Sequence, residues 1–207
     1  MKLTVFGATG ATGKHVVEQA CAAGHQVTAV VRDPSKLGRT DLTVVEADTL
    51  DPAAIEPAVA GADGVISALG TRNGRGPTTI CAEGTASILR AMTAAGTRRL
   101  VVVSASGLAT DGDDPLTKVL VKPIVQRVLR HPFADMTRME ELIRASSVDW
   151  TIIRPPRLTE GPRGDYRTAV DDGVRRGFVI SRANLAHAIL RALPAEDTFG
   201  KILTVAR

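Results

Sequence analysis

MKLTVFGATGATG, residues 1–13, contains two local structural signals in direct succession. Residues 2–6 form a short apolar run with β-branched side chains, which is typical of a buried strand. Glycines then recur at every third position, at Gly7, Gly10 and Gly13. From Ala11 to Ala23 the pattern of apolar positions is helical. The sequence therefore predicts a strand, a tight glycine turn and the N-terminus of a helix.

Such a turn forms an anion site, because backbone N–H groups at a helix N-terminus point outward and the helix dipole favours negative charge. Glycine is needed where a Cβ would block the turn, the approach of a pyrophosphate, or helix–strand packing. A phosphate-binding loop of the GxxxxGK[ST] type is excluded, since its first glycine would fall on Ala8 and its hydroxyl residue on His15. The spacing instead predicts a dinucleotide site. Its pyrophosphate loop comprises Gly7, Ala8, Thr9, Gly10, Ala11, Thr12 and Gly13.

The composition, 44% hydrophobic and 23% charged, is that of an ordinary globular protein. A length of 207 residues suits one domain, residues 1–207, with a sizeable core. No apolar run approaches the ~20 residues that span a bilayer, and the first strand is no signal peptide. We therefore expect a cytoplasmic protein without a membrane partner. Cys21 and Cys81 show neither pairing nor metal-ligand spacing, which indicates reduced core thiols.

The net charge of +4 and the isoelectric point near 9.4 raise the question of a nucleic-acid partner. Aromatic residues make up only 3% of the chain, the arginines are spread out, and no nucleic-acid-binding motif is present. A solvated arginine-rich surface and a site for an anionic cofactor account for the charge, so no nucleic-acid partner is expected. The four histidines form no ligand pattern, and no metal site is predicted.

A second strand is expected over Gln26–Val31, and its tip would meet the adenosine ribose of a dinucleotide. An acidic residue there binds the 2′-hydroxyl of NAD, whereas an arginine suits the 2′-phosphate of NADP. The sequence offers both, in Arg32 and Asp33. Asp33 is explained as an N-cap before Pro34, which opens a helical turn, and Lys36 stands one turn beyond Arg32. We therefore predict that Arg32 and Lys36 bind NADP in preference to NAD; plain surface charges are the alternative.

The rest of the chain alternates strands with helices, which indicates a parallel sheet with right-handed crossovers. Further strands are expected over residues 42–46, 63–68, 100–103, 148–154, 178–180 and 202–205. Helices are expected over residues 52–60, 77–95, 135–146 and 184–193. The fold class is therefore α/β, a Rossmann-like doubly wound parallel sheet with helices on both faces. A small C-terminal lobe, from about residue 155 to residue 207, would complete the substrate cleft.

Ligands of a doubly wound sheet bind at the carboxyl ends of its strands. Asp48 follows the third strand beside the expected adenine pocket, and Asp51 is better placed than Asp48 to cap the next helix. Gly70 and Arg72 follow the fourth strand, where Gly70 permits close backbone approach to a cofactor. Arg72 either faces the phosphates or is an ordinary loop arginine. The substrate side would be lined by residues that follow the fifth and sixth strands: Ser104, Ser106, Arg154 and Arg157.

Taken together, four segments resemble the atypical short-chain dehydrogenases/reductases: GATGATG (7–13), VVRDPSK (30–36), ADTL (47–50) and SALGTRN (67–73). Within that group the chain resembles the NAD(P)H-binding proteins that include NmrA-like regulators and flavin reductases of the biliverdin reductase B type. The resemblance implies NADP on the glycine loop, with Arg32 and Lys36 at the 2′-phosphate and Asp48 at the adenine. It extends the cofactor-binding residues to Thr49, Ala68, Leu69, Gly70, Thr71, Arg72, Ser104 and Pro155.

The chain departs from these relatives where their chemistry takes place. The Tyr-x-x-x-Lys pair of the superfamily is absent, since Tyr166 is the only tyrosine and Val170 stands where the lysine would be. A serine near the nicotinamide aligns with Ala105, and two pocket histidines align with Met136 and Arg157. Ketone reduction needs a proton donor for the developing alkoxide. The missing pair therefore favours acceptors that hold charge by delocalisation.

These observations predict an NADPH-dependent oxidoreductase that transfers a hydride to a flavin, a quinone or a similar conjugated planar small-molecule electron acceptor. Ser104, Ser106 and Arg157 are its candidate catalytic residues on the substrate side, with Arg157 binding an anionic substrate group. A non-catalytic, NmrA-like sensor of NADP(H) is the alternative. The basic stretch 118–130 would be its partner surface, or simply a solvated helix face. A nucleotide-sugar epimerase or dehydratase is the third hypothesis, which the missing tyrosine and the short C-terminal lobe disfavour.

Overall fold

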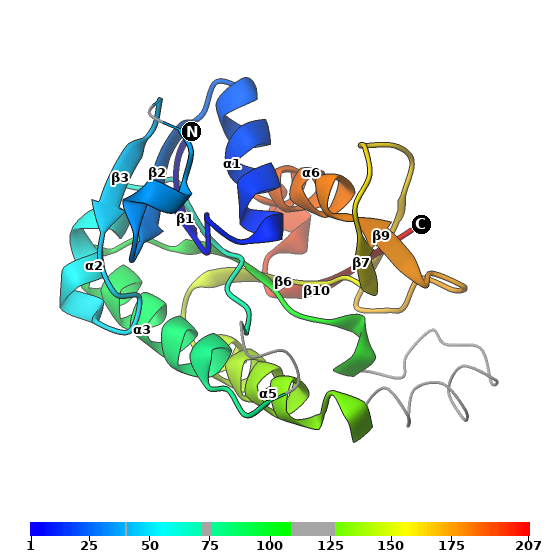
Figure 1. Cartoon of the computed structure of the whole chain (residues 1–207). Coiled ribbons are helices and arrows are strands. Elements are labelled where there is room, and N and C mark those ends of the chain that lie inside the picture. Colours follow the sequence, from blue (N-terminus) through cyan, green and yellow to red (C-terminus); the bar gives the residue numbers. More distant parts are fainter. Residues whose placement is uncertain (40, 72–75, 109–126) are drawn as a thin grey trace.

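The computed structural model describes residues 1–39, 41–71, 76–108 and 127–207. Eight strands form one sheet in the order β3-β2-β1-β4-β5-β6-β10-β8, and β7 pairs with β9 separately. All neighbouring pairs in the large sheet are parallel except β10 with β8. Helices α1 and α6 lie on one face of the sheet and α2, α3 and α5 on the other (Figure 1). The predicted doubly wound α/β fold is confirmed.

The sheet strands are β1 (Lys2–Phe6), β2 (Gln26–Val31), β3 (Thr43–Glu46), β4 (Gly64–Ser67), β5 (Arg99–Val103), β6 (Asp149–Arg154), β8 (Arg167–Val170) and β10 (Lys201–Ala206). The separate pair is β7 (Arg157–Thr159) and β9 (Val179–Ser181). The helices are α1 (Ala11–Ala22), α2 (Pro52–Val59), α3 (Ile80–Ala95), α5 (Arg130–Arg144) and α6 (Arg182–Ala192). None of these helices combines the length and apolarity that crossing a bilayer requires.

Two strands, β7 and β8, were not predicted; α5 begins earlier than expected, and α3 begins at Ile80 rather than at residue 77. β7 and β8 are short and partly exposed, so they carry little of the apolar alternation that identifies a strand. Helix α5 begins at Arg130 rather than at residue 135. Its Pro132 lies in the first turn, where a missing N–H costs no helical hydrogen bond.

Strand β1 shows how the sheet divides the core into two layers. Leu3 and Val5 pack in the cluster that includes α1 and α6, whereas Phe6 packs in the cluster that includes α2 and α3. Successive side chains of a strand point to opposite faces, so an unbroken apolar strand serves both layers at once. Thr4 also faces α2, and its hydroxyl donates to the Ala58 carbonyl at 2.5 Å. The strands that carry the functional loops are therefore held from both sides.

A buried arginine connects several elements at the amino ends of the parallel strands, away from the glycine turn. Arg99 begins β5 and is 6% exposed. Its guanidinium donates to the Ala192 and Leu193 carbonyls at 2.6 and 2.8 Å, at the end of α6, and to the Asp149 carbonyl at 2.7 Å. It also lies 4.2 Å from the centre of the Phe199 ring. Burial lowers the pKa of Arg99 to about 10. Arg99 thereby joins α6 to β5 and β6.

Arg99→Ala is expected to lower the free energy of unfolding by about 3 kcal/mol, because buried carbonyls would lose their donor and a large side chain would leave a void. In urea denaturation the midpoint should fall while the slope m stays constant. Arg98→Ala is the matched control, because Arg98 is an exposed neighbour that pairs with Asp149. Its loss should cost less than about 1 kcal/mol. Equal effects of the two substitutions would contradict the role given to Arg99.

Candidate functional site

The three glycines of the first turn serve different purposes. Gly7 has a φ of 78°, and a Cβ on it would lie 2.5 Å from the Ala68 carbonyl oxygen. A Cβ on Gly13 would lie 2.0 Å from the Gly7 carbonyl oxygen, so α1 packs directly against the turn. Gly10 donates its N–H to that same carbonyl at 2.9 Å, and a Cβ there would be only moderately crowded, at 3.1 Å. Gly7 and Gly13 are therefore required by the fold, and Gly10 leaves its exposed face to a ligand.

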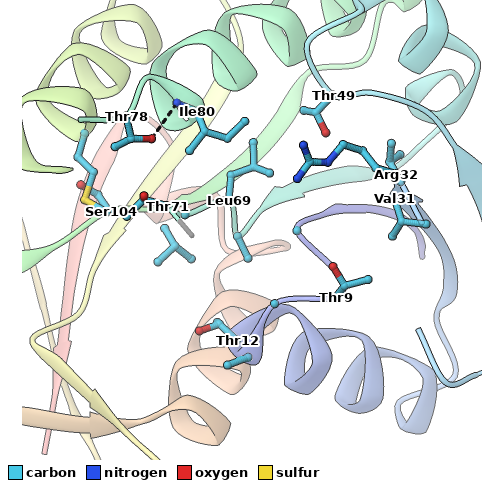
Figure 2. Close-up of a pocket in the computed structure, with 18 of the residues that line it drawn as sticks. Thr9, Thr12, Val31, Arg32, Thr49, Leu69, Thr71, Thr78, Ile80 and Ser104 are labelled. Atoms are coloured by element: carbon cyan, nitrogen blue, oxygen red, sulfur yellow. Dashed lines mark hydrogen bonds between the residues drawn. The ribbon is translucent and has the colours of Figure 1, made fainter. Parts of the chain in front are cut away.

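A cavity of about 700 Å³ lies at the carboxyl ends of the parallel strands. It begins at the glycine turn, as Figure 2 shows with Thr9 and Thr12 on the turn and Arg32 and Ser104 at opposite ends. Pockets of this volume accommodate cofactors and drug-sized molecules. Residues of the turn that line it are Gly7, Thr9, Gly10, Ala11 and Thr12. Ala8 and Gly13, which were also predicted for the pyrophosphate loop, are buried beneath the turn and do not line the pocket.

Arg32 forms one end of the pocket, together with Val31, Asp48 and Thr49. Its side chain extends into the cavity between Thr9 and Thr49 (Figure 2). Within the part of the chain that the structure describes, no ion pair engages Arg32. This arginine therefore presents an uncompensated positive charge where the second strand ends.

A second cavity, of about 360 Å³, adjoins this end and is lined by Thr9, Arg32, Asp33 and Lys36. Asp33 caps the turn Pro34–Lys36 by accepting from the Ser35 N–H, as predicted. Its other oxygen pairs with the Lys36 ammonium at 2.6 Å. These hydrogen bonds, above all the one from Lys36, lower the pKa of Asp33 to about 2. Lys36 thus lies beside Arg32 as expected, with part of its charge already engaged by Asp33.

Asp48 lines the pocket as predicted, and Asp51 caps α2 through the Ala53 and Ala54 N–H groups at 3.0 and 3.2 Å. One oxygen of Asp48 accepts from the Leu50 N–H at 3.1 Å. Among the described residues no hydrogen bond engages its other oxygen. Asp48 is exposed beside Thr49, and it therefore retains acceptor capacity at the pocket.

The middle of the pocket is formed by the segment after β4 and by the start of α3. Ala68, Leu69, Gly70 and Thr71 line it as predicted, and Arg72 lies outside the described residues. Thr78 and Ile80 also line it and were missed. Their signal was weak, because residues that precede a helix are ordinarily capping residues.

Helix α5 is attached to the start of α3 by a buried carboxylate. Asp135 accepts from the Cys81 and Ala82 N–H groups at 3.0 and 2.8 Å. The two free N–H groups at this helix end are thereby satisfied from another helix. Desolvation and the nearby Asp135 raise the pKa of Cys81 to about 12. The same attachment places Met136, the next residue of α5, on the pocket wall.

The end of the pocket opposite Arg32 is lined by Val103, Ser104, Met136, Leu158 and Arg182. Ser104 was predicted, but Ser106, Pro155 and Arg157 do not line the pocket. Ser106 opens a short turn and donates its N–H to the Pro155 carbonyl at 2.9 Å. Pro155 is itself buried.

Two further arginines differ from expectation. Arg157 is exposed on β7, and its neighbour Leu158 lines the pocket, because successive strand residues point in opposite directions. Arg154 is engaged by the buried carboxylate of Glu140, at 2.5 Å, rather than by the substrate side. The arginine that does line this end is Arg182, at the start of α6, which pairs with Glu160 at 2.5 Å. No sequence signal distinguished it.

Other sequence predictions concern positions away from the pocket. The basic stretch 118–130 lies outside the described residues as far as residue 126. The described part of the chain contains no group of three or more His, Cys, Asp or Glu side chains arranged to hold a metal. Its two cysteines are free, Cys21 half-buried and Cys81 buried.

A pocket at the carboxyl ends of parallel strands, beginning at a glycine turn and a helix N-terminus, defines a dinucleotide-binding protein of the Rossmann type. The profile of a family described as NAD(P)H-binding matches residues 7–196 of this chain. The chain therefore belongs to the NAD(P)H-binding family.

Known proteins resemble the chain along its whole length. The uncharacterized protein YwnB of Bacillus subtilis is 29% identical over 212 residues, covering 99% of this chain and 98% of YwnB. A short-chain dehydrogenase/reductase from Veillonella parvula, solved in complex with NADP, has a TM-score of 0.81 at 20% identity over 100% of this chain and 94% of its own. ChuY, an anaerobilin reductase from Escherichia coli O157:H7, has a TM-score of 0.80 at 20% identity over 100% of this chain and 97% of its own. The two structures share the fold.

Gly10→Ala is expected to fold with a loss of about 1 kcal/mol or less, since Gly10 has an ordinary negative φ and only moderate crowding. Its methyl group would stand where a pyrophosphate must approach, so the Kd for NADPH, measured by fluorescence titration, should rise at least about tenfold. Gly13→Ala provides the contrast, because its overlap with backbone should prevent stable folding. Unchanged NADPH affinity in Gly10→Ala would place the pyrophosphate elsewhere.

Proposed function

We propose that this protein is an NADPH-dependent reductase that transfers a hydride to a flavin, a quinone or a similar conjugated planar acceptor. The observation that carries the proposal is the chemistry of the pocket end formed by Val103, Ser104, Met136, Leu158 and Arg182. Val103, Met136 and Leu158 supply apolar surface there, next to Thr71 and Thr78 (Figure 2), and the described lining residues include no tyrosine, histidine or lysine. Such an end suits two stacked planar rings better than the protonation of an alkoxide.

The single tyrosine is engaged elsewhere. Tyr166 is not a lining residue of the pocket, and its hydroxyl lies 2.9 Å from Nδ1 of His187 on α6. The two rings meet edge to face. Burial raises the pKa of Tyr166 and lowers that of His187, so both groups are neutral at neutral pH. This arrangement supports an acceptor whose reduced form takes its proton from water.

The cofactor supplies the hydride when bound, and the residues of the chain orient it. Ala11 and Thr12, at the N-terminus of α1, line the pocket and would donate their N–H groups to the pyrophosphate, where the α1 dipole adds to their effect. Arg32 receives the 2′-phosphate, which favours NADP over NAD. At the other end, Met136 and Leu158 supply apolar surface for the nicotinamide and the acceptor. Arg182 places a guanidinium there for an anionic group of the acceptor.

The alternative is a non-catalytic sensor of NADP(H). The same lack of a proton donor among the described lining residues favours it, because binding alone requires none. An epimerase or dehydratase of nucleotide sugars is disfavoured for the same reason, since it needs acid–base groups at the nicotinamide end.

The decisive assay follows NADPH absorbance with and without FMN and menadione, with NADPH binding measured on the same sample. We expect oxidation that depends on the acceptor. Tight binding without turnover across a broad panel of flavins and quinones would contradict the reductase and favour the sensor.

In the same assay, Arg182→Gln should raise the KM for anionic FMN more than the KM for neutral menadione, because only FMN offers an anionic group to this guanidinium.

Arg32→Gln should weaken NADPH binding by about 10–100-fold, the equivalent of a hydrogen bond to a charged group, and leave NADH binding nearly unchanged. Lys36→Gln is the companion variant, and its smaller effect on NADPH should reflect the pairing of Lys36 with Asp33. Titration of each variant with both NADPH and NADH separates the contribution of each side chain to 2′-phosphate binding from its effect on binding of the rest of the cofactor. If Arg32→Gln weakened NADH as much as NADPH, the 2′-phosphate would not bind at Arg32.

A further inference from the structure

Behind the pocket wall at Ser104 lies a buried carboxylate with four donors. Glu140 is on α5 and is 4% exposed. Its Oε1 accepts from the Ser104 hydroxyl at 2.7 Å and from Nε of Arg154 at 2.9 Å. Its Oε2 accepts from Nη2 of Arg154 at 2.5 Å and from Nη2 of Arg144 at 3.0 Å. Glu140 thus joins β5, α5 and β6 at this end of the pocket.

The count of donors and acceptors decides the direction of these bonds. An ionised carboxylate has about four acceptor positions, and guanidinium groups have donors only. Three positions of Glu140 are filled by Arg154 and Arg144, and the fourth is filled by Ser104. Because hydrogen bonds to a charged acceptor are stronger than neutral ones, the hydroxyl proton of Ser104 is held on Glu140. The Ser104 oxygen has no second proton to offer.

Ser104 nevertheless lines the pocket, at the end opposite Arg32 (Figure 2). Ser104 is 3% exposed, and because its proton is directed at Glu140, the lone pairs of its oxygen are left for a ligand at that end. We propose that Ser104 is the acceptor in a subsite for a ligand N–H group, and that Glu140 is the positioning residue that sets this polarity. The inference rests on the proposed function in placing the nicotinamide and the acceptor at this end of the pocket.

Two consequences follow for the chemistry. Ser104 is no proton donor to the substrate, since releasing its proton from Glu140 would break a bond to a charged group. The subsite also discriminates among ligand rings, because a carbonyl or an anionic oxygen would meet the lone pairs of Ser104. Two ligands of the pocket carry an N–H: the nicotinamide through its carboxamide, and a flavin through N3.

The first arm of the test uses the cofactor alone, so it is independent of turnover. NADP⁺ is compared with its 3-acetylpyridine analogue, which replaces the carboxamide NH₂ by a methyl group of similar size. The wild type should bind NADP⁺ about five- to tenfold more tightly, as expected for one hydrogen bond. Ser104→Ala should reduce that preference to near one. Ser67→Ala, at a buried serine on the neighbouring strand β4 whose hydroxyl has no hydrogen-bond partner among the described residues, should retain it.

The second arm uses the acceptor. Binding of lumiflavin and N3-methyllumiflavin to the NADP⁺-loaded protein is measured by calorimetry in the wild type and in Ser104→Ala. If the N–H comes from the acceptor, the preference for lumiflavin disappears in Ser104→Ala, and the first arm shows no preference. Absence of any Ser104-dependent preference in both arms would overturn the subsite. NADP⁺ binding without acceptor turnover would leave the first arm intact and contradict only the proposed reductase.

Glu140→Gln tests the positioning role. The amide nitrogen of the introduced glutamine cannot accept a hydrogen bond, so the side chain should place it where fewer arginine bonds are lost. In Glu140, Oε1 on the Ser104 side receives one guanidinium bond, whereas Oε2 receives two. The nitrogen should therefore take the place of Oε1. The NH₂ group then donates to Ser104, which turns the serine proton toward the pocket. We expect the preference for NADP⁺ over the acetylpyridine analogue to vanish, as in Ser104→Ala. Arg144→Gln, which removes a bond on the Oε2 side only, should retain it; loss in both variants would indicate a merely structural role.

Discussion

Between Gly13 at the start of α1 and the carbonyl of Gly7 there is no space for a Cβ, and the position of the whole pocket depends on that contact. It brings the helix N-terminus directly onto the end of β1. Gly7 in turn lies against the chain that leaves β4, through its close approach to Ala68. The segments that line the middle of the pocket are therefore set by the same turn that would bind the pyrophosphate. Gly7 and Gly13 thus set the shape of the site through close backbone contacts.

The two ends of the pocket use different electrostatics. At one end Arg32 is exposed and lacks a carboxylate partner among the described residues, so its charge is available to an anion. Near the other end a buried carboxylate, Glu140, is compensated by the largely buried Arg154 and by the exposed Arg144. A buried carboxylate of this kind is tolerated because its acceptor positions are all filled. What reaches the pocket from this network is only the neutral oxygen of Ser104. In the proposed function, one end would select by the charge of Arg32, and the other by the hydrogen-bond polarity of Ser104 beside the guanidinium of Arg182.

The arginines show where prediction from sequence stops. Arg32 follows directly on a strand whose place in the fold is predictable, so its location could be inferred. Arg154 and Arg157 were equally plausible on the substrate side, yet one is held by Glu140 and the other points outward from β7. Arg182 reaches the pocket because α6 packs against α1, a contact between residues far apart in the chain. Pairing partners and side-chain direction at short irregular strands depend on such packing, which local patterns do not encode.

Apart from β7 and β8, the amino-acid sequence alone determined the order of the strands and the main helices. It also determined the glycine turn, the cap at Asp51 and the position of Arg32, because each follows from residues near one another in the chain. Hydrophobic periodicity and the conformational needs of glycine and proline act over a few residues, so they can be evaluated locally. Only the tertiary structure decided that Arg99 joins α6 to the sheet, that Asp135 caps α3, and that Glu140 holds the proton of Ser104. Each of these is a buried polar group whose partner comes from a distant segment, and burial is what makes the partner necessary.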